Sequence, residues 1–521
     1  MSTKQGRMAL ILLGILLLIG LLLALYPKSS AAQTPPKKLI VAVGEDLSST
    51  DPSAGFGGDT WAVTMNYAEY LINRAPSGDL GPGLATSWKV SPDGKQIDFT
   101  LRKGVKFHSG DLLTTKDIAF SFERGRAKNQ TVRSFLNSVE RLEIIDDYRF
   151  KLHLKEVDVL FIPRQCSFMV VSKSYYDRVG EDRFVREPVG TGPYKVVRYV
   201  PGEYLDIERF DDYWGEKPRL GGVKEARFLF IPDETTKAAK LKAGEIDLIS
   251  GCPYPLARDI EKSPEFKIVK LAVEHSTLSV MFNNQNPKTP WYDRRVRLAM
   301  AYAVDCDAII KNVLFGIPHR YAFLAPYELG YDPELKPYPY DPKRARELLA
   351  EAGYPNGFGF KLYWPVGGRN PMLREVAETI TSYFKAVGLR PELVSAERLA
   401  FESKYRASKG PEAEYVCYRG VGRAGLREPS EGLVNWNSRH GAFSISYNPE
   451  LEKVIAEARA TVDDTKRAEL IKKGVRIIHE EVLTFPVFNT VGVYAMKKNI
   501  DFKPTLKIQF ELLLVKDMTI R

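Results

Sequence analysis

Alternating apolar and polar positions predict β-strands early in the chain. Residues 96–101 (Gln-Ile-Asp-Phe-Thr-Leu) alternate in this way, directly after the turn sequence Ser-Pro-Asp-Gly at 91–94. A second alternating run places four apolar side chains on one face, namely Tyr148, Phe150, Leu152 and Leu154. This spacing is typical of strands with one buried face.

Apolar residues at three- and four-residue steps predict helices between and after these strands. Thr114 can cap a helix over 115–124, with Asp117 reaching back as in a capping box. The same spacing predicts further helices at 293–303, 341–353, 373–388 and 470–478. Strands and helices are mixed throughout, without a repeat or a low-complexity linker. We therefore expect a mixed α/β protein in which the chain crosses between its lobes several times.

The first 32 residues predict export. Lys4 and Arg7 precede an apolar run at 8–26, and small residues up to Ala32 follow it. This order indicates a signal peptide that is cleaved after Ala32. A 19-residue helix would span about 28 Å, so an uncleaved membrane anchor is the alternative. Both interpretations place residues 33–521 outside the cytoplasm.

Length, composition and charge favour a soluble protein of more than one domain. A chain of 521 residues is long enough for two or three domains. The net charge is +10, and residues 1–32 contribute Lys4, Arg7 and Lys28 with no acid, which leaves +7 on the exported part. Acidic residues are interleaved with this excess, and no basic tract indicates nucleic-acid binding. We expect a monomer without a nucleic-acid partner.

Cysteine and histidine spacing indicates neither a metal site nor a cofactor. The six histidines are scattered, and no Cys-x-x-Cys pair occurs. In an oxidising compartment one disulfide is possible among the four cysteines, which are Cys166, Cys252, Cys306 and Cys417.

No catalytic motif stands out. Residues 420–425 match the glycine pattern of a dinucleotide site, but Pro429 would break the helix that such a site requires. A turning loop is the favoured interpretation. No nucleophile elbow, phosphate loop or zinc-protease motif is present. A secreted hydrolase with an unrecognised pair of carboxylates remains an alternative.

Residues 190–194 (Gly-Thr-Gly-Pro-Tyr) predict a rigid turn into a strand, where two backbones can approach closely. This turn is one of several motifs that resemble family 5 of the bacterial extracellular solute-binding proteins, which include the peptide- and nickel-binding receptors of ABC importers. Another is Phe-Thr-Leu-Arg-Lys-Gly-Val-Lys-Phe-His-Ser-Gly-Asp at 99–111. The remaining motifs are at 51–52, 83–88, 188–194, 212–218, 241–247, 293–299, 338–342 and 348–355.

The resemblance implies an α/β clamp of the periplasmic-binding-protein type, type II-like and of the large cluster. Two lobes would enclose a peptide-sized solute and deliver it to a membrane permease of an ABC importer. The implied first lobe comprises 33–50, 186–275 and 492–521, and an extra domain occupies 51–185. The second lobe would be 276–491.

The family pattern also suggests residues that contact the solute. Peptide-binding members hold the ligand's amino terminus with an Asp in a loop that corresponds to 418–429 here. This loop has no Asp and carries Arg419, Arg423 and Arg427, so an anionic or N-blocked solute is expected. The full set of expected ligand-binding residues is Trp61, Asn283, Arg369, Arg374, Arg419, Arg423 and Asn489. A membrane-anchored sensor built on the same clamp is a further alternative.

Overall fold

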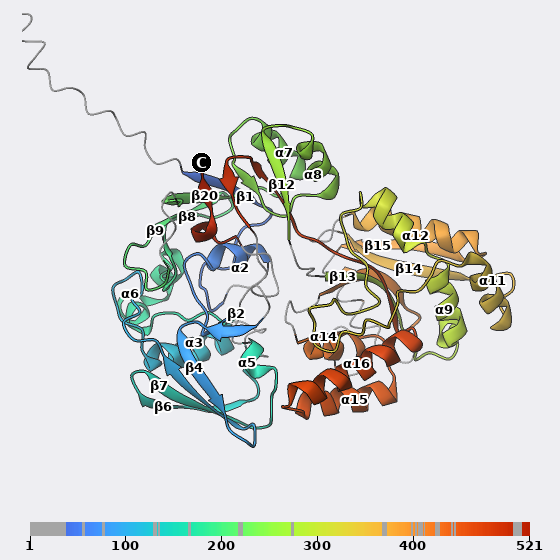
Figure 1. Cartoon of the computed structure of the whole chain (residues 1–521), viewed down its shortest axis with the longest axis horizontal. Helices are drawn as coiled ribbons and strands as arrows, with labels where there is room; N and C mark the ends of the chain where they lie inside the picture. The colour runs from blue at the N-terminus through green and yellow to red at the C-terminus, as the bar shows by residue number, and fades with distance from the viewer. Residues whose placement is uncertain are drawn as a thin grey trace, which may run out of the picture. The chain divides into compact units, whose positions relative to one another are not determined.

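The described part of the chain begins after the predicted export segment. The computed structural model describes residues 38–54, 58–74, 79–128, 133, 136–164, 168–216, 222–271, 276–366, 372–397, 400–401, 404, 410, 412–422, 428–438, 441, 444–503 and 513–521 (Figure 1). Residues 39–521 form one compact unit. The predicted signal or anchor at 8–26 and the cleavage site at Ala32 lie outside the described residues. No helix in the described part is both long and apolar enough to cross a membrane.

The first large sheet combines strands from both ends of the chain. Its order is β12-β18-β11-β1-β10-β9-β8. The strands are β1 (Leu39–Val43), β8 (Tyr194–Val200), β9 (Tyr204–Arg209), β10 (Glu225–Phe230), β11 (Leu248–Ile249), β12 (Phe266–Lys270) and β18 (Val493–Lys497). Strand β1 pairs in parallel with β10 and β11, whereas β18 pairs antiparallel with β11 and β12. Helices α7 (Glu234–Lys242) and α8 (Tyr254–Glu261) belong to this part of the chain.

A four-stranded antiparallel sheet, of order β4-β5-β7-β6, lies within the predicted extra domain. Its strands are β4 (Ala85–Val90), β5 (Gln96–Leu101), β6 (Val139–Asp146) and β7 (Arg149–Leu154). The short pair β2 (Ile72–Arg74) and β3 (Leu80–Pro82) accompanies it. The helices of this region are α2 (Gly58–Thr64), α3 (Thr115–Lys128), α5 (Phe161–Arg164) and α6 (Lys173–Arg186). Both alternating runs of the sequence are therefore strands, as predicted.

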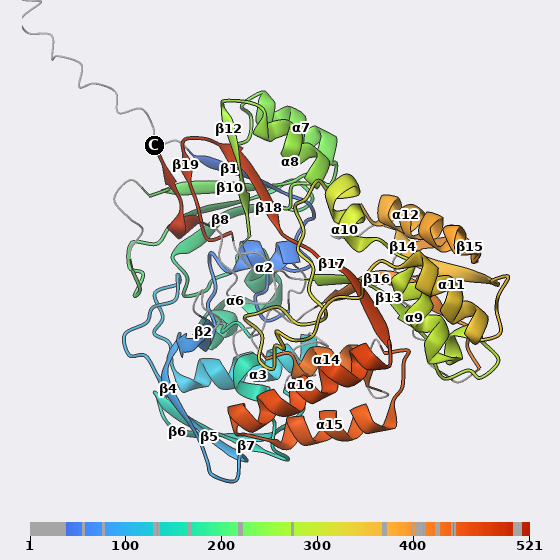
Figure 2. The same ribbon diagram turned by 45° about the vertical axis from the view of Figure 1, so that its right-hand side comes forward.

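The second large sheet has the order β15-β14-β16-β13-β17. Its strands are β13 (Ser276–Phe282), β14 (Gly359–Val366), β15 (Arg390–Glu397), β16 (Val416–Gly422) and β17 (Thr484–Asn489). The helices here are α9 (Arg294–Tyr302), α10 (Cys306–Ala308), α11 (Pro342–Glu351), α12 (Leu373–Ala386), α14 (Ser430–Asn437), α15 (Pro449–Ala460) and α16 (Asp464–Glu480). Figures 1 and 2 show α9, α11 and α12 beside β14 and β15. A small sheet of β19 (Ile500–Asp501) and β20 (Thr519–Ile520) lies near the C-terminus.

The predicted helices are present, and their caps explain why. Asp293 and Asp341 each accept a hydrogen bond from a backbone amide in the first turn of the helix that follows. Asp117 accepts hydrogen bonds from the amide and the hydroxyl of Thr114, as predicted. Helix α3 continues to Lys128, four residues beyond the predicted end at 124.

The chain passes between the two large sheets at two crossings, after β12 and before β18. The amide and the hydroxyl of Thr490 both donate to the Ser276 carbonyl, at 2.8 and 3.1 Å. The Tyr254 hydroxyl donates to the Val491 carbonyl and accepts from the Val491 amide, each at 3.0 Å. These bonds hold the second crossing against the start of β13 and against α8.

The predicted turn at 190–194 brings two backbones into contact. A Cβ atom added at Gly190 would lie 2.0 Å from the Tyr67 carbonyl oxygen, and one at Gly192 would lie 2.7 Å from the Tyr67 carbonyl carbon. The ring of His108 closes the turn: Nδ1 accepts from the Gly190 amide, so Nε2 carries the proton that is donated to the Gly192 carbonyl. Burial lowers the pKa of His108 to about 4, so the ring is neutral.

A buried carboxylate joins the same turn to the 212–218 motif. Glu69 accepts hydrogen bonds from Trp214 Nε1 at 2.7 Å, the Tyr213 hydroxyl at 2.8 Å and the Thr191 hydroxyl at 2.9 Å. Burial raises the pKa of Glu69 from 4.5 to about 7, and the three hydrogen bonds limit this rise. The motifs at 99–111, 188–194 and 212–218 therefore meet in one structural cluster.

The cysteines form no disulfide among those that the structure describes. Cys252, Cys306 and Cys417 are buried free thiols, and Cys166 lies outside the described residues. Burial raises the pKa of Cys252 to about 12 and that of Cys306 to about 11, so both remain protonated at neutral pH.

Replacement of Gly190 by Ala should destabilise the protein by about 3 kcal/mol or more, because the methyl group would overlap the Tyr67 carbonyl. The control is Gly81→Ala, since a Cβ at Gly81 meets no atom within 4 Å. Urea unfolding at neutral pH measures both variants. Equal stabilities of the two variants would contradict the close approach.

Replacement of Glu69 by Gln should change how stability depends on pH. Because the folded state binds the Glu69 proton more tightly than the unfolded state, this proton stabilises the folded wild type below about pH 4.5, and the contribution is lost as pH rises through about 7. Relative to Glu69→Gln, the wild type should lose roughly 3 kcal/mol between pH 4.5 and 8. Urea unfolding across this range measures the difference, with Glu140→Gln on exposed β6 as control. A constant difference would show that Glu69 is ionised throughout.

Candidate functional site

The two faces of strand β16 have different surroundings. Val416 and Tyr418 belong to the apolar core that contains α9 and α12. Tyr415 and Cys417 face the opposite way, into a smaller aromatic cluster with Met281. Because side chains alternate along a strand, Arg419 lies on the face of Cys417, opposite Ser279 of β13.

Arg419 is buried among aromatic rings. Arg419 is only 6% exposed to solvent. The guanidinium carbon lies 4.8 Å from the centroid of the Trp436 ring and 5.4 Å from that of Phe401. Cation–π contacts of this kind are stronger where water is excluded. The sequence predicted a site at Arg419 but gave no sign of the two rings, which come from the segments on either side of β16.

A second cation, Lys404, lies beside the neighbouring aromatic residues. The Nζ atom of Lys404 is 4.2 Å from the centroid of the Tyr363 ring, and Tyr363 stacks on Tyr415 with centroids 4.6 Å apart. Lys404 itself is exposed. We call the six residues Arg419, Lys404, Phe401, Trp436, Tyr363 and Tyr415 the cationic aromatic cluster.

The sequence predicted a turning loop at the glycine pattern 420–425. The structure shows no loop at its first glycine. Strand β16 continues through Gly420 to Gly422, because the segment stays paired with β13 up to Ser276. Residues 423–427, with the predicted Arg423, lie outside the described residues. The segment becomes described again at Glu428, which accepts from the Ser430 amide at 3.1 Å and pairs with Arg467 at 2.7 Å. Both Glu428 and Arg467 are buried.

The two predicted asparagines make structural hydrogen bonds. Asn283 donates to the Gly410 carbonyl at 2.9 Å and accepts from the Gln285 amide at 3.0 Å. Asn489 donates to the Thr277 hydroxyl at 3.0 Å and accepts from the Tyr321 amide at 3.1 Å. Both are fully buried and hold loops onto β13 and β17.

The other predicted site residues are dispersed. Trp61 is 3% exposed and packs in the core around β1 and the four-stranded sheet. Arg374 lies on α12 with its side chain 72% exposed and pairs with Glu378 at 2.9 Å. Arg369 lies outside the described residues. Of the seven predicted residues, only Arg419 lies in the cationic aromatic cluster among those that the structure describes.

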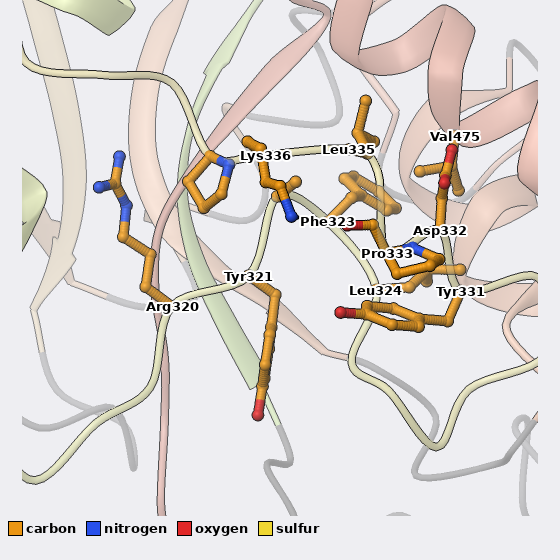
Figure 3. A pocket seen from close by; sticks show the side chains of 12 residues that line it. Arg320, Tyr321, Phe323, Leu324, Tyr331, Asp332, Pro333, Leu335, Lys336 and Val475 are labelled. Atoms are coloured by element: carbon orange, nitrogen blue, oxygen red, sulfur yellow. Dashed lines mark hydrogen bonds between the residues drawn. The ribbon is translucent and has the colours of Figure 1, made fainter.

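A small pocket lies next to Asn489. Its volume is about 200 Å³, and segments 320–324 and 331–337 form most of its wall with Val475 of α16. In Figure 3 the apolar side chains of Phe323, Leu324 and Leu335 lie together, and Tyr321 extends away from them. No group of three or more His, Cys, Asp or Glu residues in the described part is arranged to hold a metal ion.

Comparisons with known proteins agree with this architecture. The sequence profile of the bacterial extracellular solute-binding proteins, family 5 (Middle), matches residues 79–438. Heme-binding protein A of Haemophilus influenzae is 31% identical over 82% of this chain and 82% of its own length. The dipeptide-binding protein of Escherichia coli is 30% identical over 92% of this chain and 94% of its own length.

A solved structure extends the likeness to three dimensions. It is the ABC transporter-associated periplasmic binding protein DppA from Helicobacter pylori in complex with the peptide STSA. Its TM-score is 0.74 and its identity 26%, and the match covers 93% of this chain and 98% of that one. The predicted fold, the solute-binding function with an ABC importer and the place outside the cytoplasm are confirmed at the level of the family. The chain belongs to family 5 of the bacterial extracellular solute-binding proteins.

Proposed function

We propose that this receptor captures a peptide-sized solute through an anionic group, which the cationic aromatic cluster binds. The observation that carries the proposal is the position of Arg419, whose guanidinium lies over two aromatic rings on the face of β16 that carries Cys417. Guanidinium groups form paired hydrogen bonds with carboxylates and phosphates. In a site screened from water, a cation favours an anion and disfavours an ammonium group.

The relatives differ in what their names say they bind. One is named for heme, others for dipeptides and glutathione. All of these ligands contain carboxylates, and in this chain we assign that group to Arg419 and Lys404. An anionic or N-blocked compound is therefore favoured over a free zwitterionic dipeptide.

Capture requires two lobes that close on the solute. We assign 33–50, 186–275 and 492–521 to the first lobe, 51–185 to its extra domain and 276–491 to the second lobe. In support of these borders, β12 and β18 belong to one sheet, whereas β13 and β17 belong to another. A solute that contacts both lobes favours the closed form. The protein acts without catalysis, as a monomer, and the sensor and hydrolase remain the alternatives.

A matched set of peptides tests the choice of charge. We expect that C-terminal amidation of a peptide weakens its binding 10- to 100-fold, because the charged hydrogen bonds are lost, whereas N-acetylation leaves binding unchanged or stronger. Calorimetric titration of the free, N-acetylated and C-amidated forms measures this. Arg419→Gln and Lys404→Gln should remove the penalty of amidation, and Arg374→Gln on exposed α12 is the control.

Two outcomes would contradict the proposal. If N-acetylation abolishes binding while both cluster variants bind normally, the amine is recognised and the cluster is structural. If mass spectrometry after incubation finds cleaved peptide, the hydrolase alternative replaces the receptor.

Binding should also compact the protein. Small-angle X-ray scattering should show a smaller radius of gyration with saturating N-acetylated peptide, and at 100 times Kd the stability should rise by about 2.7 kcal/mol. The C-amidated peptide at the same concentration, at about 1 to 10 times its own Kd, should raise the stability by only about 0.4 to 1.4 kcal/mol. An unchanged radius with the bound peptide would argue against closure.

A further inference from the structure

A large pocket lies between the four-stranded sheet and helix α16. Its volume is about 760 Å³, and its walls include Trp88 and Val90 of β4, Ile162 of α5, and Leu329 and Val462 on the opposite side. Figure 2 shows α15 and α16 beside strands β5–β7. The space is several times the volume that one water molecule occupies.

The sheet register explains why this wall is apolar. Trp88 pairs with Phe99, and Val90 pairs with Ile97, so all four side chains share the inner face of the sheet. At the edge strand β4, this face of the sheet forms one wall of the pocket. Val90 is 37% exposed there, and Val462 across the pocket is 54% exposed. Two exposed apolar side chains on facing walls indicate an apolar occupant.

The charges around the pocket disfavour an anion. Asp79, Asp158 and Asp464 contribute carboxylates to its lining. The cation in the wall, Arg467, is neutralised by Glu428 at 2.7 Å and by Asp464. The carboxylates therefore disfavour an anion in this pocket, and its apolar side chains, which include Trp88, Val90 and Val462, offer contacts to a neutral apolar group.

Helix α14 runs from the wall of the pocket to the cationic aromatic cluster. Glu428 lies in the pocket wall just before the helix begins at Ser430, and Trp436 contacts Arg419 near its end. Six residues of helix rise about 9 Å. An extended chain covers this distance in about three residues.

We propose that the pocket between β4 and α16 receives an apolar side chain of the solute, about three residues from the anionic group that Arg419 binds. The solute is then an amphipathic anion with a neutral, apolar far end. This inference rests on the proposed function, because the anion at Arg419 fixes one end of the solute.

Three peptides with the same carboxylate test it: acetyl-Gly-Gly-Gly, acetyl-Leu-Gly-Gly and acetyl-Phe-Gly-Gly. Burial of the Leu or Phe side chain should lower the Kd of the wild-type protein about 10- to 100-fold relative to the Gly peptide. Val462→Asp should reduce this gain to less than about threefold, because it places a charge opposite Val90. Val197→Asp, at an equally exposed valine of β8, should leave the gain unchanged.

Equal affinities of the three peptides for the wild type would overturn the proposal. A gain in affinity that Val462→Asp leaves intact would also overturn it. So would a Val462→Asp variant that binds the Gly peptide and the Leu peptide equally more weakly, because that result would assign Val462 to lobe closure. Arg419→Gln separates the two proposals. If the gain survives in that variant and C-amidation weakens binding as much as it does in the wild type, the pocket stands and the anion site fails.

Discussion

The two chain crossings are the constraint on which the rest of this structure depends. The chain connects the two large sheets through the segments after β12 and before β18. Thr490 donates twice to Ser276, and the Tyr254 hydroxyl satisfies both the amide and the carbonyl of Val491. Buried backbone groups need such partners. These bonds hold the segment before β18 against the start of β13, which follows the first crossing, so the two crossings lie side by side.

Arginine serves two distinct purposes around this frame. Arg297 donates to the carbonyls of Trp291 and Glu481 and thereby ties α9 to the end of α16. Arg124 pairs with buried Asp51 and with Glu181. Such arginines join elements. Arg419 also lies over aromatic rings, with its guanidinium carbon 5.4 Å from the Phe401 centroid and 4.8 Å from that of Trp436. Its Nε atom is 3.5 Å from the Gly420 carbonyl oxygen, to which it donates.

The sequence predicted what depends on local chemistry. The helix caps at Asp293 and Asp341 act within one turn, so three or four neighbouring residues are enough to predict them. In the strand at 96–101, the alternation of apolar and polar residues is enough to predict which face is buried. The course of β16 through Gly420 and Gly422 could not be predicted, because pairing with β13 overrides the flexibility of the glycines. The rings around Arg419 were missed for a similar reason, since their proximity is produced by the tertiary fold.

The motifs that carried the family resemblance describe the scaffold and not the solute. Those at 99–111, 188–194 and 212–218 converge on His108 and Glu69, whose hydrogen bonds are made to backbone carbonyls and to neighbouring side chains. The residues assigned to solute binding, Arg419 and Lys404, lie outside them. The cluster around His108 and Glu69 and the cluster that we propose to contact the solute share no residue, so a change of solute need not disturb the bonds between these motifs. The missing Asp in the 418–429 loop is for this reason more informative about the solute than the motifs that match.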